Sequence, residues 1–203
     1  MARRTKEDAE KTREALLDAA ERVFIRDGVA AATLEDIARE AGVTRGAVYW
    51  HFDNKQDVFS AMHNRVKLPM DMLYQRMVSG DDPLGGLQAV CTEVLQMIAT
   101  TPRAQNVYTV LFLRCEQMNC NTSSYKKEIA EKRLEVIAKF QKVFAKAARE
   151  KKLAPGVTAS FAASALHSWF IGILMDYLRN QATYPLAKLA PKLTATFFRG
   201  VLR

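Results

Sequence analysis

One short stretch near the start of the chain gathers hydrogen-bond donors that suit recognition of double-stranded DNA. Arg45 offers a forked guanidinium that can bind the O6 and N7 atoms of a guanine, and Thr44 beside it adds a hydroxyl group. Tyr49, Trp50 and His51 follow with phenol, indole and imidazole donors, which can reach phosphate oxygens. These residue types predict a surface that reads base edges at one end and binds the phosphate backbone at the other.

Neighbouring residues complete this predicted surface. Gly46 has no side chain and therefore lets the backbone approach a duplex closely, while Lys55 is placed to bind a phosphate. Thr33 suits a helix cap, and the sequence leaves open whether its hydroxyl also touches phosphate. Val48 and Phe52 are interpreted as core residues that hold the segment in place.

Arrangements typical of enzymes are weak in this sequence. His51, His63 and His167 lie far apart, and no Ser or Cys forms a recognisable group with a histidine and an acid. Cys115 and Cys120 lack further ligands nearby for a metal, and no glycine-rich phosphate loop occurs. We therefore expect neither an enzyme nor a cofactor or metal site, with a cysteine-based redox sensor as an open alternative.

The composition fits a globular helical protein. Its 203 residues (22.8 kDa) are 49% hydrophobic and 26% charged, which allows a core without disulfides. Nine glycines and six prolines supply few turns, so a fold of many strands is disfavoured. With no signal peptide, the three cysteines, one of them Cys91, predict reduced thiols and a cytoplasmic location. Residues 153–175 carry no charge, but polar side chains such as Ser164 and Ser168 favour a buried helix over a membrane span.

The net charge of +8 is not located where the donors are. Residues 1–60 hold 10 Lys/Arg and 12 Asp/Glu, a net charge of −2, whereas residues 61–203 carry +10. Much of the excess lies in residues 126–152, which we interpret mainly as a solvated helix face. The prediction of DNA binding therefore depends on the local arrangement of residues and not on the isoelectric point.

Hydrophobic spacing and capping signals place the donors on helices. A helix is expected over residues 8–27, ended by Gly28. Thr33 and Asp36 form a capping-box pattern that starts a short second helix, and Gly42 ends it.

A third and a fourth helix follow at once. Thr44 caps a short helix that reaches about Trp50, and Asn54 caps a longer one. Two short helices joined by a glycine turn are typical of a helix-turn-helix, whose second helix enters the major groove.

The rest of the chain is also predicted to be helical. We expect an all-α protein of about nine helices, with a three-helix DNA-binding domain over residues 1–60 (helix-turn-helix about 33–52) and a larger helical domain over residues 61–203. The expected boundary lies inside a continuous helix. The later helices are expected at about 70–79, 84–100, 104–118, 123–152, 156–181 and 186–202.

The segment 44–52, TRGAVYWHF, followed by Asn54 and Lys55, resembles the DNA-binding domain of the TetR family of repressors. Residues 1–6 (MARRTK) and 41–52 further resemble the AcrR and TtgR subgroup, which represses multidrug efflux pump genes. The strong resemblance covers about residues 1–60. It implies that the following residues occupy DNA-contacting positions: Thr33, Thr44, Arg45, Gly46, Tyr49, Trp50, His51 and Lys55.

A homodimer is expected, because one helix-turn-helix makes too few contacts and two half-sites of an inverted repeat are read together. The last two helices combine small and large apolar residues, and the resemblance implies that they form a four-helix bundle with the partner. The alternative is that both helices serve only the core of one subunit. The expected dimerisation residues are Phe161, Ala165, Leu174, Leu189, Leu193 and Phe197.

Methionines and other apolar residues indicate an adaptable pocket for a small hydrophobic or amphipathic effector. Polar groups of Glu116 and Asp176 would favour cationic ligands if they face it, whereas Ile171 stands where a multidrug relative has an acid and predicts a more apolar pocket. Plain core packing is the alternative. The expected effector-binding residues are Met62, Val66, Met70, Leu73, Met77, Val94, Met97, Ile98, Tyr108, Phe112, Cys115, Glu116, Phe140, Trp169, Phe170 and Ile173.

The sequence and the resemblance together predict a ligand-responsive transcriptional repressor of multidrug (RND-type) efflux pump genes, acting without a cofactor. Two alternatives stay open. One is a carrier or enzyme for hydrophobic small molecules on an all-α scaffold, and the other is a TetR-type regulator of metabolic genes. An exposed surface of Arg45, Tyr49 and Lys55 separates the first alternative, since a carrier has no use for it.

Overall fold

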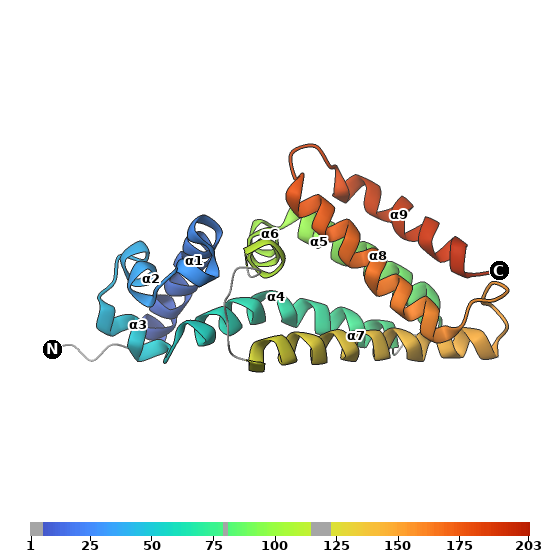
Figure 1. The fold of residues 1–203 in the computed structure, drawn as a ribbon, viewed down its shortest axis with the longest axis horizontal. Coiled ribbons are helices and arrows are strands. Elements are labelled where there is room, and N and C mark those ends of the chain that lie inside the picture. Colours follow the sequence, from blue (N-terminus) through green and yellow to red (C-terminus); the bar gives the residue numbers. More distant parts are fainter. Residues whose placement is uncertain (1–5, 79–80, 115–122) are drawn as a thin grey trace. The chain divides into compact units, whose positions relative to one another are not determined.

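The computed structural model describes residues 6–78, 81–114 and 123–203, and the regular elements there are helices (Figure 1). The prediction of an all-α fold is confirmed: apart from one isolated antiparallel bridge between Leu153 and Leu202, the described residues contain no strand pairing. In chain order the elements are α1 Lys6–Ala31, α2 Leu34–Glu40, α3 Arg45–His51, α4 Lys55–Val78, α5 Pro83–Thr100, α6 Pro102–Thr109, the π-helical turn η1 Val110–Arg114, α7 Ser123–Arg149, α8 Ala159–Arg179 and α9 Leu186–Val201.

These helices belong to two compact units. The first contains α1, α2, α3, the part of α4 up to Leu68, and α6 from Arg103 with η1. The second contains the rest of α4 together with α5, α7, α8 and α9. A domain boundary between residues 60 and 61 stays a prediction, and α4 is continuous across that point.

The first unit is built around α1. The apolar face predicted for this helix is buried and includes Leu16, Val23 and Phe24. The ring of Phe24 meets that of Phe59 on α4, with 6.3 Å between the ring centroids. Both α2 and α3 pack on this unit, α2 against α1 and α3 against α2. The helix-turn-helix is therefore fixed to a small core of its own.

Two predicted helix boundaries are wrong. A new helix was expected near residue 70, but α4 passes through Pro69 without a break. An interior proline, which lacks an N–H and crowds the preceding turn, costs a helix about 3 kcal/mol or more. Burial of Val58, Phe59 and Met62 anchors the preceding turns of α4 against that cost. The helix expected over residues 104–118 is also interrupted, because after Thr109 the backbone widens into η1, which packs against α1.

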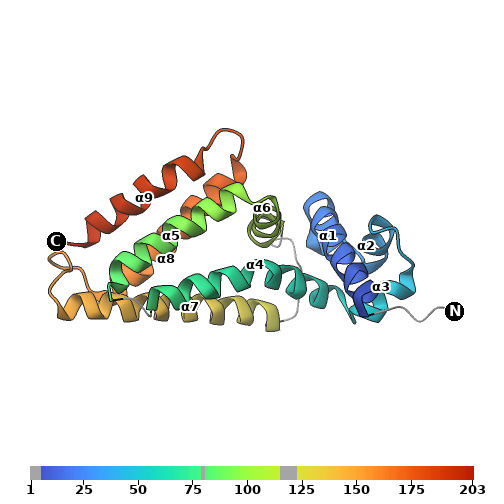
Figure 2. The ribbon, with the colours of Figure 1, turned by 180° about the vertical axis from the view of Figure 1, so that it is seen from behind.

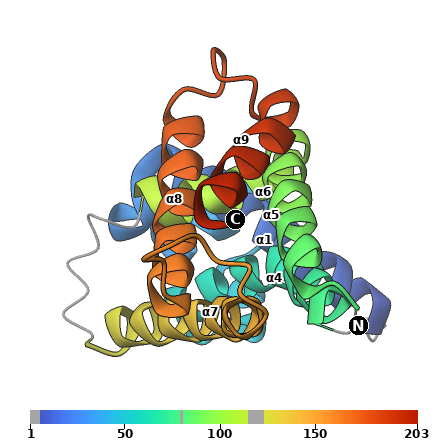
Figure 3. The same ribbon diagram turned by 90° about the vertical axis from the view of Figure 1, so that its right-hand side faces the viewer.

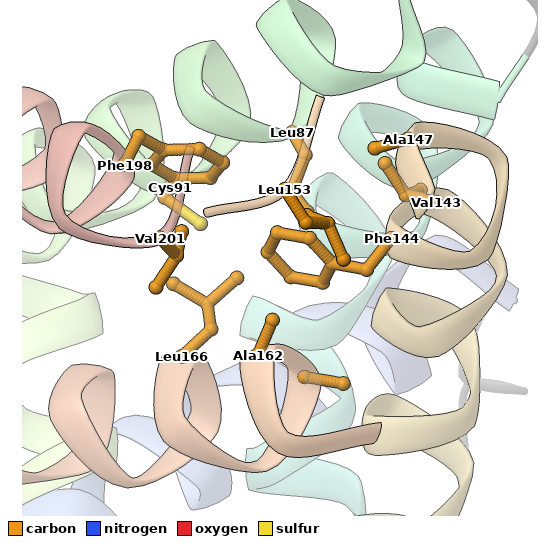
Figure 4. Packing of buried hydrophobic residues seen from close by; sticks show 11 residues of the cluster. Leu87, Cys91, Val143, Phe144, Ala147, Leu153, Ala162, Leu166, Phe198 and Val201 are labelled. Atoms are coloured by element: carbon orange, nitrogen blue, oxygen red, sulfur yellow. The ribbon is translucent and has the colours of Figure 1, made fainter. Parts of the chain in front are cut away.

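The second unit has its core between four helices. In Figure 3, α9 lies between α5 and α8, and Figure 2 shows α5 from the opposite side to Figure 1. Hydrogen bonds reinforce the pairing of α5 with α9: the hydroxyl oxygens of Thr92 and Thr194 lie 2.7 Å apart, and Gln96 Nε2 donates to the carbonyl of Ala187 at 3.2 Å. The buried cluster, shown in Figure 4, includes Leu87, Cys91, Val143, Phe144, Ala147, Leu153, Ala162, Leu166, Phe198 and Val201.

The uncharged stretch noted in the sequence forms most of α8. This helix is long and apolar enough to cross a membrane by length and composition. However, Ala162, Ala163 and Leu166 are fully buried in the core of the second unit, and Thr158 caps the helix by accepting a hydrogen bond from the N–H of Phe161 at 3.1 Å. Packing within the protein therefore accounts for the apolar residues on the buried side of α8.

An ion cluster joins three elements of the first unit. Arg65 on α4 is only 9% exposed and reaches three carboxylates on one face of α1. Its guanidinium nitrogens lie 2.8 Å from Glu14, 2.6 Å from Asp18 and 2.9 Å from Glu21. Arg103, near the start of α6, adds a contact to Asp18 at 3.1 Å. Two arginines thus hold three acids together where α1, α4 and α6 meet.

Burial and the arginines act in opposite directions on these acids. Burial alone would raise the pKa of Asp18, but the hydrogen bond and charge of Arg65, together with Arg103, outweigh it and lower the pKa. At Glu21, which is 5% exposed, burial outweighs both arginines and raises the pKa. The same two arginines therefore fully offset burial at Asp18 but only partly at Glu21.

We expect Arg65→Met to lower the free energy of unfolding by about 2–3 kcal/mol, because removing one partner of a largely buried pair leaves the remaining charges uncompensated. Urea unfolding followed by circular dichroism measures this. Lys11→Met is the matched control, since Lys11 pairs with Glu7 while both side chains are more than two-thirds exposed, and it should cost less than about 0.5 kcal/mol. An Arg65→Met protein as stable as this control would contradict the assignment.

Candidate nucleic-acid interface

The turn between α2 and α3 is set by Gly42. This glycine has a φ of +68°, a conformation that L residues with a side chain rarely adopt. Its N–H donates to the carbonyl of Arg39 at 3.1 Å, and the N–H of Val43 donates to Ala38 at 3.0 Å, which closes a Schellman-type turn. The predicted glycine turn is confirmed, and it fixes the direction in which α3 leaves α2.

Capping and burial on one side hold both short helices. Thr33 accepts a hydrogen bond from the N–H of Asp36, whose carboxylate accepts one from the N–H of Thr33, so the predicted capping box is present. Thr44 caps α3 by accepting from the N–H of Ala47 at 3.3 Å. Val48 is fully buried and Phe52 nearly so. The prediction that these two residues hold α3 in place is confirmed, and the opposite side of the helix faces outward.

The outward side carries most of the residues predicted to bind DNA. Arg45, Gly46 and Tyr49 are exposed, and Trp50 exposes 70% of its surface. An indole that remains this open to solvent contributes little to folding and is accessible to a partner. His51 differs from the others: it is half-buried, and its ring packs edge-on against Trp50 with 4.5 Å between centroids.

Three side chains on this surface contact one another. Arg45 Nε lies 2.9 Å from Glu35 Oε1, and the Tyr49 hydroxyl donates to the same oxygen at 3.2 Å. The guanidinium carbon of Arg45 also lies 5.4 Å from the centroid of the Tyr49 ring. The sequence analysis missed Glu35, because an acid in the first turn of a helix is an ordinary helix feature. Its contact with α3 depends on the turn geometry and cannot be derived from spacing.

Lys55 has a structural role that its residue type did not reveal. Its ammonium nitrogen donates to the carbonyls of Ala30 at 2.9 Å and Ala32 at 2.7 Å. These carbonyls lie at and just beyond the C-terminal end of α1, where backbone acceptors lack helical partners. A phosphate contact by Lys55, which stays a prediction, would have to share this ammonium.

Gly46 is not required by the fold. It lies within α3, has no positive φ, and a Cβ built on it would meet no neighbouring atom closer than Thr44 Oγ1 at 4.0 Å. Glycine in a helix is less stable than alanine by about 1 kcal/mol. Gly46 therefore lowers the stability of α3 relative to alanine, and no close packing contact at this exposed position requires a glycine.

The residues predicted to bind an effector are divided between the two units. Met62 and Val66 are buried in the first unit, where Tyr108 and Phe112 stack with 6.1 Å between their rings. Burial raises the pKa of Tyr108 to about 12, so its phenol stays neutral. In the second unit Val94 and Ile98 are buried, Met97 and Ile173 are half-buried, and Phe140, Trp169 and Phe170 pack against its core. The side chains of Met70, Leu73 and Met77 and the residues Cys115 and Glu116 lie outside what the structure describes.

Asp176, a further candidate for the pocket, lies on an exposed part of α8. Its carboxylate accepts a hydrogen bond from Asn180 Nδ2 at 2.9 Å. The prediction of a cationic ligand bound by Asp176 gains no support from this placement.

The residues predicted to form a dimer differ in accessibility. Phe161 is 60% exposed on α8, and Leu189, Leu193 and Phe197 are half-buried along one side of α9, as is Ala165 on α8. Leu174 is 1% exposed, so its side chain packs within its own subunit, and its part in an interface stays a prediction. Phe197 also packs on Trp169, with 5.1 Å between their rings, so this predicted dimer residue and this predicted effector residue touch within one chain.

Cys91 is the cysteine that the structure describes, and it is buried in the second core. Burial raises the pKa of its thiol to about 12, which keeps it protonated and unreactive at neutral pH. Within the described part of the chain, no group of three or more His, Cys, Asp or Glu side chains is arranged to hold a metal ion.

Comparison with known families finds two matches that together span most of the chain. Residues 16–62 match the family described as bacterial regulatory proteins, tetR family. Residues 82–201 match the C-terminal region of MAATS-type transcriptional repressors. The first match contains the helix-turn-helix, and the second spans all the elements from α5 to α9.

Individual proteins similar to this chain are repressors. The transcriptional repressor BepR of Brucella suis biovar 1 is 34% identical over 201 residues, which cover 98% of this chain and 96% of BepR. The crystal structure of NalD, the secondary repressor of the MexAB-OprM multidrug efflux pump in Pseudomonas aeruginosa, is 38% identical with a TM-score of 0.87 and covers 98% of this chain and 99% of NalD. SmeT, a repressor from Stenotrophomonas maltophilia solved in complex with triclosan, is 28% identical with a TM-score of 0.82, covering 95% and 92%.

We expect Gly46→Ala to change folding and DNA binding in opposite directions. The free energy of unfolding should rise by about 0.5–1 kcal/mol, because alanine favours a helix and nothing in the first unit obstructs its methyl group. Affinity for DNA should fall, since the methyl group projects from the exposed side of α3. Thermal unfolding and a fluorescence-anisotropy titration on the same preparation measure both. A variant that is more stable and binds DNA as tightly as the parent would show that Gly46 does not face the duplex.

Proposed function

Because the chain belongs to the TetR family of bacterial regulatory proteins, we propose that it is a ligand-responsive repressor of multidrug efflux pump genes. The observation that carries this proposal is similarity to repressors over nearly the whole chain, including the second unit. BepR aligns with 98% of this chain, and NalD, which represses an efflux pump, has the same fold at 38% identity. A chain that had only borrowed the helix-turn-helix would match in the first unit alone.

Repression in this proposal depends on α3 entering the major groove of operator DNA. Arg45 would bind a guanine edge, while Thr33, Thr44, Tyr49 and Trp50 would contact the backbone around it. All five side chains are exposed in the structure. Phosphate contacts fix the register and base contacts provide the sequence preference, so a single exposed arginine at the start of α3 suits the second task.

A homodimer would present two such helices to an inverted repeat. The family dimerises, and the accessible apolar side chains of α8 and α9, such as Phe161, Leu189 and Leu193, are the residues we propose for the interface. Recognition helices of a dimer read half-sites about one helical turn, roughly 34 Å, apart. Binding therefore depends on the distance between the two α3 helices as well as on their contacts.

Induction follows from this dependence on distance. An effector releases DNA only if it binds more tightly to a conformation that does not fit the operator. The helix α4 supplies residues to both units and is continuous between them, so a shift of α4 on ligand binding would reach the first unit. SmeT has been solved with triclosan, a neutral aromatic compound. The predicted effector-binding residues are mostly apolar and Asp176 is exposed, so we propose neutral aromatic ligands for this chain as well.

The alternatives from the sequence receive less support. A carrier or an enzyme on an all-α scaffold would not explain the exposed α3 surface or the likeness to repressors along the whole chain. A regulator of metabolic genes would share the fold. However, the fatty-acid regulators with a similar structure are only 17–18% identical, which supports the fold and nothing further.

We expect a specific gel shift with the promoter next to the protein's own gene, and Arg45→Ala should weaken it by about 1–3 kcal/mol. The reason is the loss of a bidentate base contact, so the preference for one base pair should relax as well. Binding to a mixed-sequence duplex of the same length serves as the reference. If neither this promoter nor the neighbouring ones gave a shift beyond that reference, the proposal of a local repressor would fail.

We expect triclosan and amphipathic antibiotics to release the protein from this operator. Phe112→Ala should raise the ligand concentration needed for release about tenfold, because an aromatic contact is lost, while operator affinity without ligand stays at the parent value. Leu134→Ala is the control, because it removes an exposed apolar side chain of α7 that is not among the predicted effector-binding residues. Equal ligand responses in both variants would remove Phe112 from the effector site.

A further inference from the structure

We propose that Glu35 is a positioning residue for sequence-specific DNA binding, because it holds Arg45 with one edge of its guanidinium directed to a guanine. The inference rests on the proposed function and adds a residue from α2 to the recognition surface of α3. Glu35 itself need not touch a base. It acts through Arg45 and, through the shared oxygen Oε1, also through Tyr49.

The guanidinium of arginine has two edges that can each donate a pair of hydrogen bonds. One edge includes Nε, and the other consists of the two terminal nitrogens. In the ion pair with Glu35 the nearest guanidinium atom is Nε, 2.9 Å from Oε1. Within the described residues, the structure records no protein acceptor for the terminal nitrogens of Arg45. The edge formed by the two terminal nitrogens therefore stays available to bind the O6 and N7 atoms of one guanine.

The Tyr49 ring restricts the same side chain from a second direction. Arg45 and Tyr49 are four residues apart and lie on one face of α3, where the guanidinium packs over the ring at 5.4 Å. With Glu35 binding Nε and the ring beneath, a long flexible side chain is ordered before DNA arrives. Ordering in advance lowers the entropy that binding must otherwise supply.

A purely structural role for the Glu35–Arg45 pair is disfavoured by its surroundings. The side chains are 42% and 71% exposed, and ion pairs so open to water add little to stability. The joint between α2 and α3 is already fixed by the Gly42 turn and by burial of Val48. The pair is therefore not needed to hold the two helices together.

The negative charge of Glu35 has a second consequence for recognition. A carboxylate beside the recognition helix is repelled by phosphates on any duplex. At a site where Arg45 binds a guanine, the base contact outweighs the repulsion between Glu35 and the phosphates. On other sequences no base contact offsets that repulsion. Specificity of this kind combines an attractive contact with a repulsive element.

The test compares Glu35→Ala and Glu35→Gln with the parent and with Arg45→Ala. The probes are the operator duplex from the protein's own promoter, the same duplex with single guanines replaced by 7-deazaguanine, and a mixed-sequence duplex of equal length. The guanine read by Arg45 is the one whose replacement no longer matters in Arg45→Ala. Glu40→Gln is the matched control, since it removes the same charge from the same helix. In the parent protein Glu40 pairs with Arg22 and Arg26 of α1 and not with Arg45.

We expect Glu35→Ala to lower discrimination at that guanine about tenfold and to tighten binding to the mixed-sequence duplex. Glu35→Gln should tighten the mixed duplex equally but lose less discrimination, because its amide oxygen can still accept the hydrogen bond from Tyr49 and so keep the ring beneath Arg45. In the Arg45→Ala background, Glu35→Ala should leave discrimination unchanged. Glu40→Gln should behave as the parent, and melting curves verify folding of every variant.

Three results would overturn the inference. The first is unchanged discrimination in Glu35→Ala, and the second is an equal loss in the presence and absence of Arg45. Equal discrimination in the Gln and Ala variants would also reject positioning and leave only the effect of charge. A parent protein that bound the operator and the mixed duplex alike would instead reject the proposed function, so the two failures are distinguishable.

Discussion

The recognition surface depends on burial of one side of a very short helix. α3 has seven residues, fewer than two full turns, and a helix of that length does not hold its shape in water by itself. Its conformation is supplied from outside by the Thr44 cap, the Gly42 turn and the buried side chains of Val48 and Phe52. Because Val48 and Phe52 bury one side of α3, residues on the other side are not needed for packing and are available for DNA.

Electrostatic interactions in the first unit are arranged around that surface. Three acids of α1, Glu14, Asp18 and Glu21, are neutralised by Arg65 and Arg103. Glu40 of α2 is held by Arg22 and Arg26. Four of the twelve acids in residues 1–60 are thus paired with arginines away from Arg45. A domain with a net charge of −2 can therefore still present an arginine to a polyanion, because charge placement matters at contact distances more than the total does.

How much the sequence could predict depended on the range of each interaction. Caps and turns involve residues within four positions of one another, so Thr33, Gly42 and Thr44 were predicted correctly from residue type. The contacts of Lys55 with Ala30 and Ala32, and of Arg65 with α1, join residues separated by 23 positions or more. Their partners depend on the packing of the unit. The continuation of α4 through Pro69 was missed for a similar reason, since local propensity opposes it and anchoring by distant side chains permits it.

The proline in α4 makes the stiffness of that helix uneven. Residue 69 has no N–H to donate to the carbonyl four positions earlier, which is that of Arg65. The turns before this point are anchored by Val58, Phe59 and the charged cluster of Arg65, so they resist bending. The turn at Pro69 lacks one of the backbone hydrogen bonds that keep a helix straight, so it bends more easily than the turns before it. A bending force on α4 will therefore act mainly at the turn that contains Pro69, directly after Arg65, which fastens the helix to α1.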